Sequence, residues 1–160
     1  DLRRALRQTA SGIGGIGPET FILVSSITLG TVFEAALPDM GVLGWLEALA
    51  LPAWAIILIV IMTMNVTGLV GMHAIVTGTL LLVIFTSVPT GVADLVLMQA
   101  LLIGWGLCSG ISIASLTVAV GATMFGIPPT ELITRANIAF VFLTSLIAAG
   151  LLWALNGVLV

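Results

Sequence analysis

The sequence has few charged residues, and it contains no lysine and no tyrosine. Only 7% of its 160 residues are charged, whereas 60% are hydrophobic. A soluble domain typically carries about 25% charged residues, because its surface must be hydrated. So few charges cannot cover a globule of this size. We therefore expect an all-α, polytopic transmembrane protein with about four or five membrane segments, whose partner over most of its surface is the lipid bilayer.

Cysteine and histidine occur once each, as Cys108 and His73. One cysteine excludes an internal disulfide and a cysteine-based metal site, and one histidine excludes a multi-histidine site within the chain. The HExxH, GxSxG and P-loop motifs are absent from the sequence. The sequence therefore predicts no catalytic residues, no metal site and no cofactor, and we do not expect an enzyme.

Basic residues are limited to four arginines, three of them (Arg3, Arg4 and Arg7) at the N-terminus and the fourth, Arg135, near the other end. No basic stripe exists, so a nucleic-acid partner is not expected. Loops on the cytoplasmic side carry excess arginine and lysine, which predicts a cytoplasmic N-terminus. Residues 1–17 are expected to form a basic interfacial segment. Because the chain starts at Asp1 without an initiator methionine, we expect a fragment or a processed half.

The length of each apolar segment indicates whether it can span a membrane, since a membrane helix needs about 20 residues. The pattern predicts a first span over 18–37, an interfacial helix over 41–51, a hairpin over 52–88, a broken helix over 92–127 and a final span over 138–160. Thr130 is expected to cap a helix in the polar connection.

The predicted orientation depends on how 92–127 crosses the membrane, and it is the same for both interpretations of the hairpin. The hairpin 52–88 is either re-entrant, with its tip over 65–71, or two complete spans. Taking 92–127 as one broken crossing puts Arg135 on the cytoplasmic side with the N-terminal arginines. The same crossing places Asp39, Glu47 and Asp94 on the outer side.

Two polar, glycine-bearing clusters interrupt the apolar segments. The first contains Asn65, Thr67, Gly68, Gly71 and His73, and the second contains Ser109, Gly110, Ser112, Ser115 and Thr117. Non-helical backbone at membrane depth requires protein or a wet cavity around it. Transporters use such breaks for binding, with helix N-termini facing anions while carbonyls and hydroxyls bind Na⁺. The clusters therefore predict a site for a small anion accompanied by a cation.

A simpler interpretation of the same residues is close helix packing. Glycine, serine and threonine are common where membrane helices touch, and Gly106 and Gly110 have the spacing of a packing motif. His73 is either a proton carrier or a neutral hydrogen-bonding residue. Cys108 is interpreted as a small packing residue.

The order of elements resembles one inverted repeat, similar to the C-terminal half, of secondary transporters of the ion transporter superfamily. These include divalent anion–sodium symporters, citrate carriers and membrane subunits of tripartite periplasmic transporters. Two stretches carry the resemblance: Gly68-Leu-Val-Gly-Met-His-Ala-Ile-Val-Thr77 is similar to a Gly-x-His-Pro segment, and Ser109-Gly-Ile-Ser-Ile-Ala-Ser115 to a serine-rich break. Met64 replaces the serine of a Ser-Asn-Thr tip, and Ala74 replaces the proline.

The resemblance implies an elevator transporter in a bacterial inner membrane. Its substrate and ion site would include Asn65, Thr67, Gly68, Ser109, Gly110 and Ser112, to which the residue pattern adds His73 and Ser115. Na⁺ would bind near Asn65 and Ser109, or H⁺ would be the coupling ion. A second repeat or partner membrane chain would complete a homo- or hetero-oligomer.

The predicted function is secondary active symport of a small organic anion such as a carboxylate, coupled to Na⁺ or H⁺. Two alternatives stay open at this point. One is a non-transporting membrane scaffold or assembly subunit. The other is a small membrane-embedded binding component of an import complex.

Overall fold

The computed structural model describes residues 20–113 and 115–160, and within them every regular element is a helix. The elements are an N-terminal helix (Thr20–Met40) that ends in the 3₁₀ turn η1 (Leu37–Met40), then α2 (Val42–Leu49), α3 (Ala53–Leu69), α4 (Ala74–Thr86), α5 (Asp94–Cys108), α6 (Leu116–Phe125), α7 (Pro129–Leu132) and α8 (Arg135–Leu159). The all-α prediction is thus confirmed. The expected basic segment 1–17 lies outside the described residues.

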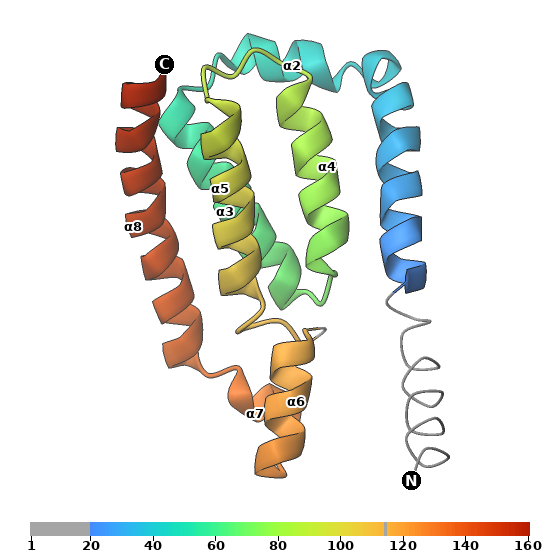
Figure 1. Cartoon of the computed structure of the whole chain (residues 1–160), viewed down its shortest axis with the longest axis vertical. Helices are drawn as coiled ribbons and strands as arrows, with labels where there is room; N and C mark the ends of the chain where they lie inside the picture. The colour runs from blue at the N-terminus through green and yellow to red at the C-terminus, as the bar shows by residue number, and fades with distance from the viewer. Residues whose placement is uncertain (1–19, 114) are drawn as a thin grey trace, which may run out of the picture.

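The chain runs up and down between two ends of the molecule (Figure 1). α2 lies across one end and joins the N-terminal helix to α3, as the short helix expected over 41–51. α3 descends, α4 returns to the same end, and α5 descends again. α6 continues beyond the level where α3 turns into α4, and α8 runs back to the end that α2 covers.

The polar connection before the last helix differs from the prediction. Thr130 caps no helix; it lies inside α7, whose N-cap is Pro128. Thr134 is the N-cap of α8, where its Oγ1 accepts a hydrogen bond from the Asn137 amide at 3.2 Å. Because of this cap, α8 begins at Arg135, three residues before the expected start of the final span.

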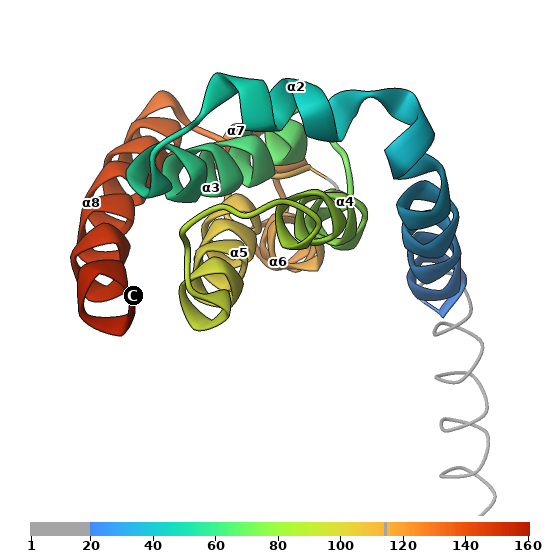
Figure 2. The same ribbon diagram turned by 90° about the horizontal axis from the view of Figure 1, so that it is seen from above.

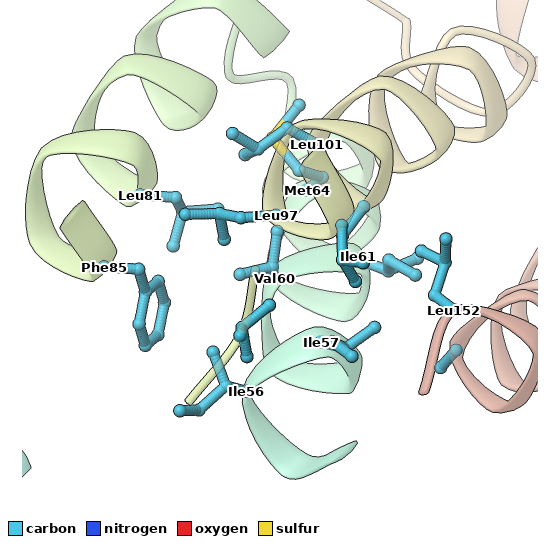
Figure 3. Close-up of a cluster of buried hydrophobic side chains, with 14 residues drawn as sticks. Ile56, Ile57, Val60, Ile61, Met64, Leu81, Phe85, Leu97, Leu101 and Leu152 are labelled. Carbon is cyan, nitrogen blue, oxygen red and sulfur yellow. The ribbon is translucent and has the colours of Figure 1, made fainter. Parts of the chain in front are cut away.

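α3 is the centre of the bundle and packs against α4, α5 and α8 (Figure 3). Ile57, Val60 and Ile61 of α3 are fully buried, and Phe85 of α4 and Leu97 of α5 meet them. Apolar residues surround most of α3 because it has neighbours on several sides. A helix that is apolar all round is expected in such a position.

The N-terminal helix stands beside α4, at the edge of the bundle (Figure 2). Its buried positions, Ser26, Gly30 and Leu37, recur at helical spacing and form one narrow stripe. A Cβ atom at Gly30 would overlap the Thr79 methyl group of α4. Small residues therefore let these two helices approach closely.

Two of the described helices, Thr20–Met40 and Arg135–Leu159, are long and apolar enough to cross a membrane by length and composition. Their most apolar 18-residue windows are only 17% and 22% buried inside the protein. A core helix of a soluble protein would be mostly covered. The apolar helices α3, α4, α5 and α6 are shorter, with 10–17 residues each.

The Asn156 side chain of α8 forms hydrogen bonds with the backbone of the loop that precedes α5. Its Oδ1 accepts a hydrogen bond from the Ala93 amide at 2.8 Å, and its Nδ2 donates one to the Gly91 carbonyl at 2.9 Å. We expect Asn156→Leu to lower the apparent Tm in detergent, because two partly buried backbone groups lose their partner at about 1–3 kcal/mol each. Asn137→Leu in the same helix is the control, because the Asn137 Nδ2 bond to the Leu132 carbonyl is exposed and water can replace it. Equal Tm values for the two variants would contradict this role of Asn156.

Candidate functional site

An open cavity of about 220 Å³ lies where α4 starts, α5 ends and α6 starts. Four of the predicted site residues line it: His73, Ser109, Ser112 and Ser115. They come from both polar clusters of the sequence, which lie 36 residues apart between His73 and Ser109. The structure thus brings part of each predicted cluster to one cavity.

Two helix N-termini meet at this cavity. α4 and α6 run in opposite directions from it, one toward each end of the molecule (Figure 1). His73 is the N-cap of α4, and its Nδ1 accepts a hydrogen bond from the Ile75 amide at 3.3 Å. Ser115 is the N-cap of α6, and its Oγ accepts one from the Val118 amide at 3.1 Å. Each cap fixes the direction in which its helix starts.

Backbone amides are the strongest donors that these helix starts can offer. Ala74, Leu116 and Thr117 line the cavity, and they occupy the first turns of α4 and α6. First-turn amides make no intrahelical hydrogen bond, and they carry the partial positive charge of a helix N-terminus. Two such helix starts favour a positive potential near the cavity, whose described lining residues include no lysine and no arginine.

His73 adds one side-chain donor to the cavity. Its Nδ1 accepts from the Ile75 amide, so the neutral ring carries its proton on Nε2. An Nε2–H group donates a hydrogen bond and accepts none. His73 in this tautomer therefore reinforces the preference for an electron-rich ligand.

The hydroxyl groups of Ser109 and Ser115, in the segment between α5 and α6, already donate hydrogen bonds to backbone carbonyls. Ser115 Oγ donates to the Ser109 carbonyl at 2.6 Å, which closes the segment between α5 and α6. Ser109 Oγ donates to the Gly106 carbonyl at 2.7 Å. With its hydrogen committed, the Ser109 hydroxyl can offer its lone pairs, which suit a cation or a ligand N–H or O–H group.

Asn65 and Thr67 do not line the cavity, contrary to their prediction as tip residues. Both lie inside α3. Asn65 is fully buried; its Nδ2 donates to Ser145 Oγ of α8 at 2.8 Å, and its Oδ1 has no partner among the residues that the structure describes. Thr67 Oγ1 donates to the Thr63 carbonyl at 2.7 Å and accepts from Thr77 Oγ1 at 3.0 Å. These residues join α3 to α8 and α4.

Gly68 and Gly110 also lie outside the lining. A Cβ atom at Gly68 would come within 2.8 Å of Cys108 Sγ, so Gly68 lets α3 approach α5 closely. A Cβ at Gly110 would meet only the Leu107 carbonyl oxygen, at 3.6 Å. The hairpin turns at Val70 to His73, later than the expected tip, because Gly71 supplies the positive φ of 91° that the turn requires.

Several lining residues were not predicted as part of a site. They are Met72, Ala74, Trp105, Cys108 and Leu116. Ala74 and Leu116 are the first residues of α4 and α6, and an apolar side chain in the sequence does not signal a place at a cavity. Trp105 was detectable, since it lies one helical turn before Cys108 and Ser109.

No protein-family model matches the chain, and no curated protein or solved structure matches it either. A functional assignment therefore rests on the geometry and chemistry of this cavity.

Proposed function

We propose that the protein is a secondary active membrane transporter, or half of one, for a small organic anion such as a carboxylate, coupled to Na⁺ or H⁺. One observation carries the proposal: the starts of α4 and α6 face a single cavity from opposite sides. Transporters bind anionic groups with the N-termini of interrupted helices near the middle of the membrane. The helix pair α5 and α6, interrupted over 109–115, has this form.

The chemistry of the lining favours an anion. We take the first-turn amides and the His73 Nε2–H group as its donors, since the described residues of its lining include no carboxylate and no arginine. Partial charges from backbone dipoles hold an anion less tightly than a buried ion pair. Moderate affinity suits transport, because the ligand must leave the site as well as enter it.

A membrane location agrees with how charges are distributed along the helices. Asp39, Glu47 and Asp94 belong to η1, α2 and the start of α5, at one end of the bundle. Arg135 starts α8 at the opposite end. The α3–α4 turn lies at the level of the break between α5 and α6, short of α7, as a re-entrant hairpin would.

For a coupling ion, Ser109 is better placed than Asn65. Ser109 lines the cavity and can offer hydroxyl lone pairs to Na⁺, whereas Asn65 is buried between α3 and α8. If the ion is H⁺, the His73 side chain of the lining is the candidate to bind it. Uptake driven by a Na⁺ gradient or by a pH gradient separates these two cases.

A scaffold or assembly role is the second candidate, because α6 exposes much apolar surface. Met124 is 78% exposed and Phe125 72%, and α6 packs mainly against α7. A partner membrane chain or a second repeat would cover this helix in either role. Uptake measurements therefore decide between the two candidates.

Proteoliposome uptake of a radiolabelled carboxylate tests the proposal. We expect uptake above that of empty liposomes, dependent on a Na⁺ or pH gradient. Thr117→Trp, at an exposed residue of the lining, should reduce uptake at least tenfold by filling the cavity. Thr123→Trp places the same indole on an exposed position of α6 outside the cavity and should leave uptake unchanged. Absence of uptake by the unsubstituted protein would favour the scaffold.

A further inference from the structure

A second, apolar groove of about 250 Å³ lies between α4 and α5 on the side that faces the N-terminal helix. From α5 it is lined by Met98, Leu101, Leu102 and Trp105, and from α4 by Ile75, Gly78, Thr79 and Leu82. Thr79 Oγ1 donates to the Ile75 carbonyl at 2.8 Å, so its hydrogen is already used. The groove therefore offers contact with hydrocarbon and little else.

The groove and the polar cavity share a wall. Trp105 lines both of them, and the neighbouring residues Ala74 and Ile75 line one each. Met98, Leu102 and Trp105 lie on one face of α5, three or four residues apart. The same face continues to Cys108 and Ser109, which line the polar cavity. The same surface thus changes from apolar to polar at Trp105.

We infer that the ligand is an amphipathic monocarboxylate, with its carboxylate between the starts of α4 and α6 and its alkyl tail in the groove beyond Trp105. The inference rests on the proposed function and specifies its substrate class. The seven residue steps from Met98 to Trp105 span about 10 Å of helix, which suits a medium-length alkyl chain.

The groove excludes a second charge on the ligand. Among the described residues, its lining includes no basic side chain and no helix start, so a second carboxylate there would lose its hydration without compensation. Gly78 and Met64 both line the groove, and a Cβ atom at Gly78 would lie in ordinary contact with Met64 Cε, at 3.7 Å. A larger side chain at Gly78 would extend into the space proposed for the tail.

Equilibrium binding of acetate, butanoate and octanoate to the protein in nanodiscs tests the inference. We expect affinity to rise by up to about fourfold per added methylene group. Gly78→Leu should weaken octanoate binding at least tenfold and leave acetate binding unchanged. Leu102→Phe, at an exposed groove residue, should have the same selectivity if Gly78→Leu does not fold. Gly106→Leu, where a Cβ meets no atom within 4 Å, is the control.

A spectroscopic measurement locates the tail. A variant that keeps only Trp105, with Trp45, Trp54 and Trp153 changed to Phe, should show saturable quenching by ω-bromo-octanoate. A variant that keeps only Trp153 should not, because the apolar groove beside Trp54 and Trp153 shares no lining residue with the polar cavity. Quenching of Trp105 by brominated phospholipid that octanoate does not displace would overturn the inference, because a bilayer lipid would then fill the groove.

The two proposals fail in different ways. Acetate binding with no dependence on chain length would overturn the amphipathic ligand and leave the carboxylate transporter intact. Failure of all three acids to bind would overturn both.

Discussion

Leu116→Pro should weaken carboxylate binding by about 10- to 100-fold, because it removes one backbone donor from the cavity. A hydrogen bond to a charged group contributes about 1.5–3 kcal/mol, and each 1.4 kcal/mol is about tenfold in affinity. Leu116 is the first residue of α6, where proline is well tolerated. Its side chain is 69% exposed, so little packing is lost.

The backbone conformation of Ser115, which precedes Leu116, is compatible with a proline at position 116. Ser115 has φ −83° and ψ 141°, in the extended region that a residue before proline prefers. His73, which precedes Ala74 at the start of α4, has φ −72° and ψ 131°. Ala74→Pro should therefore remove the equivalent amide from the opposite side of the cavity. We expect the double variant to bind more weakly than either single variant.

Leu116→Ala is the matched control, since it shortens the side chain and keeps the amide. Isothermal titration with octanoate and with acetate gives both affinities. Binding by Leu116→Pro equal to that of Leu116→Ala would show that the α6 start does not contact the anion. The transporter proposal would then lose the observation that carries it.

Helices and their order were predictable from the sequence, because apolar segment length and proline position dominate both. The short helix α2 and the interruption between α5 and α6 follow from breaks in the apolar pattern near Pro38 and Ser109. The exact ends of the helices could not be predicted from the sequence. Thr134 rather than Thr130 caps the last helix, and a single threonine cannot signal which of two nearby caps the packing selects.

The candidate site was only half predictable. His73 and Ser115 reach the cavity because each one caps a helix that starts there. Asn65 carries the same polar signal in the sequence, but its side chain turns toward Ser145 of α8. Which helix a polar residue faces depends on tertiary packing, and no pattern within α3 reveals it. The amide donors of Ala74 and Leu116 leave no trace in side-chain chemistry at all.

Glycines illustrate the same limit and lead to a further expected effect on stability. Gly106 and Gly110 have the spacing of a packing motif, yet a Cβ at Gly106 would meet no atom within 4 Å. Gly104, one half-turn earlier, is the close contact. A Cβ there would lie 2.9 Å from Met64 Cβ and 3.4 Å from Ile61 Cα. These atoms belong to or adjoin the backbone of α3 and cannot move aside as a flexible chain end could.

Gly104→Ala should therefore destabilise the bundle, and Gly106→Ala should not. Overpacking a core position costs about 1–3 kcal/mol, whereas alanine at an open helix position gains up to about 1 kcal/mol over glycine. The same methyl group, added two residues apart on α5, should thus shift the apparent Tm in opposite directions. Thermal unfolding in detergent, with both variants side by side, measures this difference. Equal Tm values would mean that α3 and α5 approach less closely at Gly104 than the structure places them, and the cavity at the end of α5 would then differ in shape as well.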